Sequence, residues 1–270
     1  MPSLSLAVRT TVLAAAAAAS AARFAASSTE IKLGNTVPYS GPASFYSCVG
    51  LSTAAYFAKV NDEGGINGRK VTVLSVDDAL APPKTVEQVR KLVEQEEVDA
   101  IVNQVGTATA SSLRQYLNQK GVPQLFVQSG SNNFQQPKNF RFSTSALMSY
   151  EFEAKMYGQV IARDTPNAKV ALLYQNDDYG KDYLRGLKAG WGKALVAEIT
   201  YEQTDPTVDS QILALKAAGA DVVVLAAYSK QVSQSLRKMD ELGWKPQAWI
   251  SHVSAQVHPT LDLVGLDKVV

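Results

Sequence analysis

Seven polar or aromatic side chains follow predicted strands of this chain, and they are the residues best placed to do chemistry: Tyr46, Thr107, Gln128, Ser129, Tyr179, Tyr228 and His252. In open α/β sheets, ligands bind outside the carboxyl ends of the strands, so a site is expected in these loops. Hydroxyls, amides and tyrosines can hold a small polar or aromatic molecule, but they offer few groups for acid–base catalysis. The set therefore predicts a binding site.

Two of these residues suit an anion. Thr107 stands where a predicted helix begins, so its hydroxyl and the free backbone N–H groups could bind a carboxylate, although an ordinary helix cap would use the same residue. Ser129, beside Gly130, could serve the same carboxylate or belong to a turn. Each tyrosine alone could be a packed aromatic, but tyrosines at strand ends in both halves of the chain favour a shared ligand site.

The sequence contains few residues in the patterns that mark catalytic or metal sites. The chain has no Gly-x-Ser-x-Gly elbow, no phosphate loop, and no Gly-x-Gly-x-x-Gly after its first predicted strand. His252 and His258 lie in one short stretch without a partner at metal-ligand spacing, and Cys48 is the single cysteine. We therefore expect no enzymatic activity, no metal site and no cofactor.

Apolar β-rich runs alternate with helical patterns, which is typical of parallel sheets covered by helices on both faces. A glycine-dense turn over 61–70 ends one helix and leads into a strand, with Gly64, Gly65 and Gly68 able to adopt positive φ angles. We predict an α/β fold of two doubly wound parallel-sheet lobes, 23–140 and 141–270. The expected strands are 31–37, 71–74, 100–102, 124–127, 169–174, 221–226 and 247–250.

Residues 1–22 differ from the rest of the 270-residue chain, because Arg9 precedes an alanine-rich run that ends in small residues near Ala22. This segment resembles a secretory signal peptide, and a helical or disordered tail is the alternative. Without Arg9 the 26 basic residues become 25, against 25 acidic residues. A neutral mature chain argues against a nucleic-acid partner, and we expect a soluble, exported, periplasmic protein that is a monomer.

The ordered motifs resemble the type I periplasmic solute-binding proteins of ABC importers, the leucine/isoleucine/valine-binding protein family. The matching segments extend over about 31–266 and occur in the family's order: 31–34, 39–42, 61–70, 77–78, 169–173 and 178–181. The resemblance implies two lobes that close on a ligand about hinge segments, as periplasmic binding proteins do, and deliver it to a membrane permease.

The resemblance also assigns roles. The family's carboxylate-binding hydroxyl loop falls on Thr107, with help from Gln128 and Ser129, and its first-lobe cleft aromatic falls on Tyr46. The second-lobe ligand contacts fall on Tyr179 and Tyr228.

One position departs from the family pattern. Members that bind α-amino acids place an acidic residue for the ammonium group where this chain has His252. A buried ammonium without a carboxylate partner is costly, so an aromatic or other organic acid is the favoured ligand. Asp177 or Asp178 could still serve an ammonium, which keeps amino acids as the alternative. A ligand-sensing receptor ectodomain is the second alternative, and an enzyme on an α/β scaffold the third.

Family chains are longer and return to the first lobe before they end. We therefore expect that the second hinge crossing and the C-terminal part of the fold are missing here.

Overall fold

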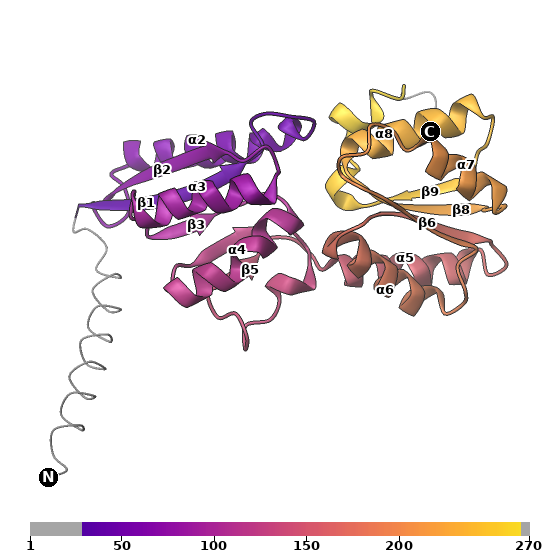
Figure 1. The fold of residues 1–270 in the computed structure, drawn as a ribbon, viewed down its shortest axis with the longest axis horizontal. Helices are drawn as coiled ribbons and strands as arrows, with labels where there is room; N and C mark the ends of the chain where they lie inside the picture. The colour runs from indigo at the N-terminus through magenta and orange to yellow at the C-terminus, as the bar shows by residue number, and fades with distance from the viewer. Residues whose placement is uncertain (1–28, 266–270) are drawn as a thin grey trace, which may run out of the picture.

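The computed structural model describes residues 29–265, which form two parallel β-sheets flanked by helices (Figure 1). The first sheet has five strands in the order β2-β1-β3-β4-β5, and the second has four in the order β7-β6-β8-β9. The predicted fold class, two doubly wound α/β lobes, is confirmed. The predicted signal segment 1–22 lies outside the described residues.

The first lobe alternates strands and helices in regular sequence. Its elements are β1 (Glu30–Val37), η1 (Ser44–Ser47), α2 (Cys48–Asp62), β2 (Lys70–Asp77), α3 (Pro82–Glu94), β3 (Ala100–Val102), α4 (Thr107–Lys120), β4 (Gln124–Val127), η2 (Asn132–Phe134) and β5 (Ser143–Ser145). Helices α3 and α4 cover one face of the sheet around Ile101, and Phe57 of α2 packs on the other face beside Val102.

The second lobe repeats this pattern. Its elements are α5 (Tyr150–Asp164), β6 (Val170–Gln175), α6 (Asp178–Trp191), β7 (Ala197–Tyr201), α7 (Asp209–Ala217), β8 (Val222–Ala226), α8 (Ser229–Glu241), β9 (Gln247–Ile250), η3 (His252–Ser254) and η4 (Val257–Leu261). Strand β8 is buried along its whole length. Because its side chains alternate, Val222 and Val224 pack against α5 and α6, whereas Val223 and Leu225 pack against α7 and α8.

The glycine turn between α2 and β2 fixes where the helix ends and where the strand begins. Gly65 has φ +75°, and a Cβ atom there would lie 2.2 Å from the Arg69 carbonyl oxygen. The Asn61 side chain accepts a hydrogen bond from the Val71 N–H and donates one to the Val71 carbonyl, both at 2.8 Å. The end of α2 is therefore tied to the start of β2.

The first sheet extends beyond the expected lobe boundary at 140. Strand β5 pairs in parallel with β4, and the chain enters α5 of the second lobe only after Ser145. Its Ser-Thr-Ser sequence has no apolar alternation, so the sequence pattern does not reveal this strand. Within residues 29–265, every helix is too short or too polar to cross a bilayer.

Candidate functional site

A cavity of about 300 Å³ lies between the lobes, and residues from both lobes line it. We call it the inner cavity. Four of the seven predicted site residues contribute to its wall: Tyr46, Gln128, Tyr228 and His252. The other lining residues are mostly apolar or aromatic, namely Phe45, Cys48, Val49, Leu80, Val105, Gly106, Leu147, Tyr150, Val253 and Gln256. The carboxyl ends of strands from both sheets thus meet at one ligand-sized space.

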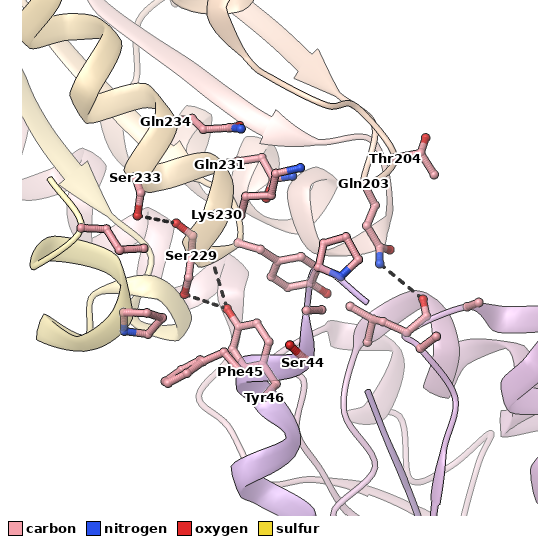
Figure 2. Close-up of a pocket in the computed structure, with 18 of the residues that line it drawn as sticks. Ser44, Phe45, Tyr46, Gln203, Thr204, Ser229, Lys230, Gln231, Ser233 and Gln234 are labelled. Atoms are coloured by element: carbon pink, nitrogen blue, oxygen red, sulfur yellow. Dashed lines mark hydrogen bonds between the residues drawn. The ribbon is translucent and has the colours of Figure 1, made fainter. Parts of the chain in front are cut away.

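Tyr46 bridges the two lobes. It sits in η1 after β1, and its hydroxyl donates to the Val253 carbonyl at 3.2 Å. The same hydroxyl lies 3.1 Å from the Ser229 Oγ (Figure 2). Its ring is 5.7 Å from that of Tyr228 between centroids. Burial raises the pKa of Tyr46, so the hydroxyl remains a neutral donor and acceptor at this contact.

Thr107 and Ser129 lie behind the wall of the inner cavity. Their hydroxyl oxygens are 2.7 Å apart and share a hydrogen bond, and the two residues are 1% and 0% exposed. The wall in front of them is formed by Gly106 and Gln128. Gly106 has φ +99°, and a Cβ atom there would come within 2.6 Å of Leu80 Cδ1. At this part of the wall the first lobe therefore presents a backbone segment and one amide to the cavity, while its two predicted hydroxyls bond to each other behind it.

The second lobe presents a packed group of tyrosines. Tyr179, at the start of α6, is 1% exposed and stacks on Tyr228 with centroids 5.8 Å apart and 12° between the planes. Tyr150 meets Tyr179 edge-on at 4.6 Å and itself lines the cavity, a contact that the sequence analysis did not anticipate. Tyr228 thus forms the cavity-facing side of an aromatic stack, and the buried Tyr179 packs behind it.

His252 is paired with a buried carboxylate. Its Nδ1 lies 2.6 Å from Oε2 of Glu153, and its backbone N–H donates to Oε1 at 2.9 Å. The hydroxyls of Tyr157 and Tyr183 also donate to Glu153. Although burial opposes ionisation, the hydrogen bonds from His252, Tyr157 and Tyr183 hold the pKa of the Glu153 carboxyl below its usual range. Glu153 is therefore a fully hydrogen-bonded carboxylate directly behind the cavity wall.

Sequence reasoning missed Glu153, which lies 99 positions before its partner His252. A signal was nevertheless present. Glu153 follows Tyr150 by three positions and precedes Ala154, so it falls on the buried face of α5, where an acidic residue demands a partner.

A second, larger cavity of about 780 Å³ adjoins the inner cavity, and we call it the outer cavity; Figure 2 shows residues that line it. Tyr46, Tyr228, Phe45 and Leu80 line both cavities. Hydroxyls, amides and two basic side chains complete the outer wall, among them Ser44, Gln203, Thr204, Ser229, Lys230, Gln231, Ser233, Gln234 and Arg237. Gln203 also donates across the lobes to the Leu80 carbonyl at 3.4 Å.

Asp177 and Asp178 do not line the inner cavity. Asp177 caps α6 by accepting from the Gly180 N–H, and Asp178 accepts from the Asn133 side chain at 2.6 Å. Nowhere in residues 29–265 do three His, Cys, Asp or Glu side chains gather where they could hold a metal ion.

Two α/β lobes with a ligand-sized cavity between their strand ends define a two-lobed binding protein. The sequence profile described as periplasmic binding protein matches residues 30–269, and the chain belongs to that family.

Among curated relatives, the chain is 28% identical over 261 residues to Leu/Ile/Val-binding protein homolog 7 of Brucella abortus (strain 2308). That match covers 91% of this chain and 64% of the relative, so the chain spans just under two thirds of the relative's length.

Solved structures share the fold. A substrate-binding periplasmic protein from Ralstonia solanacearum superposes with a TM-score of 0.80 at 22% identity, covering 88% of this chain and 68% of its own. An ABC transporter solute-binding protein from R. palustris in complex with benzoate superposes with a TM-score of 0.74 at 17% identity, covering 84% and 63%. At these identities the likeness concerns the fold alone.

Proposed function

We propose that this protein captures a small solute in the inner cavity and delivers the closed, liganded form to the membrane permease of an ABC importer. The observation that carries the proposal is the inner cavity itself, which residues from both lobes enclose at the carboxyl ends of their strands. A volume of about 300 Å³ is at the lower end for small-molecule sites. In this proposal the protein acts by binding, and the family's name supports the periplasm as the place of this step.

The proposed ligand carries a carboxylate and an apolar or aromatic body, as an aromatic acid does. The rings of Tyr46, Tyr228 and Tyr150 supply flat apolar surface, and Gln128 and His252 supply the polar contacts. In this assignment Tyr46, Gln128, Tyr228 and His252 touch the ligand, whereas Thr107, Ser129 and Tyr179 hold the wall in shape. The benzoate bound by the R. palustris relative is a ligand of this chemical class.

Branched-chain amino acids are the second candidate, because the curated relatives are named as Leu/Ile/Val-binding protein homologues. Such a ligand has an ammonium group that needs an acceptor. Asp177 and Asp178, the acids considered for this role, have hydrogen-bond partners of their own away from the cavity. This arrangement favours the acid over the amino acid.

A thermal-shift screen tests the proposal. Purified protein is heated with benzoate and other aromatic acids, dicarboxylates, leucine, isoleucine and amides. A ligand at about a hundredfold its Kd adds roughly 2.7 kcal/mol to the free energy of unfolding, which shifts the melting temperature measurably. Stabilisation by aromatic acids is expected. Stabilisation by leucine alone would select the amino-acid alternative, and turnover of any bound compound would contradict a binding role.

A further inference from the structure

The Glu153–His252 pair gives the inner cavity an orientation and a charge preference. Nothing else in the cavity wall carries a full charge, because its residues within 29–265 include no Asp, Glu, Lys or Arg. His252 is thus the one basic side chain of that wall. Its side chain is 34% exposed, against 3% for Glu153 behind it.

Glu153 determines which atom of the imidazole meets the ligand. Ionised carboxylates only accept hydrogen bonds, so the proton of the Nδ1 contact belongs to His252. Among the described residues Nδ1 and the backbone N–H of His252 have hydrogen-bond partners, and Nε2 has none. Nε2, on the opposite edge of the ring, is therefore the polar atom left for a ligand.

Glu153 also has no acceptor position left for an ammonium group. A carboxylate has about four acceptor positions. In Glu153 each oxygen accepts two hydrogen bonds, Oε1 from Tyr157 and the His252 N–H, and Oε2 from Tyr183 and His252 Nδ1. An α-ammonium group would have to displace one of these donors in a buried site, which costs the hydrogen bond it breaks.

We infer that Glu153 is a positioning residue that presents Nε2 of His252 as the receptor for the acid group of the ligand, at the second-lobe end of the inner cavity. This inference rests on the proposed function and reverses the orientation expected from the sequence, which placed the carboxylate at Thr107 and Ser129. Those hydroxyls are at most 1% exposed and bonded to each other, and neither residue lines the inner cavity.

The ligand class follows from this geometry. When both ring nitrogens carry a proton, Nδ1 donates to Glu153 and Nε2 donates to the carboxylate of the ligand, so the ring lies between two carboxylates. The body of the ligand then lies against Tyr228, Tyr46 and Gln128 toward the first lobe. A monoacid without an amino group offers Nε2 a charged acceptor and the tyrosines an apolar body, whereas an amide offers Nε2 a neutral acceptor.

Matched ligands and variants test the inference by calorimetric titration. Benzoate and benzamide have the same shape and differ in charge. Wild-type protein is expected to bind benzoate at least tenfold more tightly than benzamide. His252→Gln and Glu153→Gln should each remove most of that preference, whereas Thr107→Val should leave the benzoate Kd within about twofold. Glu241→Gln, which neutralises an exposed acid on α8 of the same lobe, is the control for net charge.

Three results overturn the inference: a benzoate preference that survives in His252→Gln, a loss confined to Thr107→Val, or binding of leucine in preference to benzoate. A spectroscopic measurement separates this inference from the proposed function. Long-range ¹H–¹⁵N spectra of the ligand-free protein should show a proton on Nδ1 of His252, with the signal altered in Glu153→Gln.

If no compound in the panel binds, the proposed function fails, and the spectrum still decides the role of Glu153. A wild-type His252 without a proton on Nδ1 contradicts that role, whereas a protonated Nδ1 that changes in Glu153→Gln supports it.

Discussion

The two lobes contribute differently built walls to the inner cavity. The first-lobe wall consists mostly of apolar and aromatic side chains with one amide, at Gln128, and the Thr107 and Ser129 hydroxyls behind it bond to each other. The second-lobe wall is the face of a packed core, in which Tyr228 rests on Tyr179 and His252 rests on Glu153. Both walls come from loops after parallel strands. The difference shows that loops at equivalent positions in similar lobes can be supported differently, by a hydrogen bond between two hydroxyls in one lobe and by a packed core in the other.

The largest expected effect concerns the second-lobe wall. Replacing Tyr179 by alanine removes a ring that contacts Tyr150, Tyr183 and Tyr228 inside the core. Truncation of a buried aromatic residue costs about 3–5 kcal/mol, so the second lobe should unfold at a much lower urea concentration. Tryptophan fluorescence follows this transition, because Trp191 and Trp249 belong to or pack against the same cluster. A stability close to wild type would contradict the role of Tyr179 as a core residue.

A smaller effect is expected in the first-lobe wall. Thr107→Val keeps the shape of the side chain and leaves the Ser129 hydroxyl without its nearest partner. The Ser129 hydroxyl still accepts from the Ser131 N–H, so we expect a loss of about 1 kcal/mol in stability, the contribution of one buried hydrogen bond. Urea denaturation measures it, with Ser112→Ala as a control for a half-buried hydroxyl on the same helix. Equal losses from Thr107→Val and Tyr179→Ala would remove the contrast between the two walls.

The contact between the walls depends on Tyr46. Tyr46→Phe removes the hydroxyl that reaches Ser229 and Val253 across the lobes while keeping the ring. A hydrogen bond contributes about 1 kcal/mol, so the Kd for a bound acid should rise about fivefold. Small-angle scattering should show a larger mean radius of gyration. Tyr39→Phe is the matched control, because the Tyr39 hydroxyl lies 2.7 Å from Ser75 within the first lobe. Identical behaviour of the two variants would show that Tyr46 does not link the lobes.

The smallest expected effect is a difference between the two lobes in how their stability depends on pH. Burial raises the pKa of Asp177, in the second lobe, to about 6, so the folded state retains a proton that the unfolded state releases near pH 4. Its contribution to the free energy of unfolding is therefore greatest below pH 4 and declines as the pH rises from about 4 to about 6. Asp77, in the first lobe, behaves oppositely. Although burial opposes ionisation, hydrogen bonds from Lys84 and Ser40 hold its pKa well below the usual range, and its contribution is lost as the pH falls.

Asp177→Asn keeps a good N-cap and abolishes this titration. Between pH 4 and 6, the free energy of unfolding should fall by about 1 kcal/mol less in Asp177→Asn than in wild type, after allowance for solvent screening. Thermal denaturation across this pH range measures it. Parallel profiles for wild type and variant would show that Asp177 titrates as an ordinary carboxyl.

Local sequence was informative about most elements and less so about edge strands. Apolar runs and glycine turns placed the central strands within a residue or two, since β1, β6 and β8 are buried and rich in branched side chains. The sequence analysis did not predict β5 or β7. Strand β5 is three polar residues, and β7 shows the half-exposed alternation of an edge strand between two helices. Edge strands depend on their neighbours more than on their own composition.

Two parallel-sheet lobes with polar loops at the strand ends could be predicted from the sequence. The spacing of apolar residues and the residue types of the turns, on which that prediction rests, are local properties of the chain. Which loop residues reach the inner cavity depends on the tertiary structure. Tyr46, Gln128, Tyr228 and His252 line the inner cavity, whereas Thr107, Ser129 and Tyr179 are buried behind it. It also brought Glu153 to His252 across 99 positions of sequence. Burial and hydrogen-bond partners depend on how distant helices pack, and no local pattern encodes that.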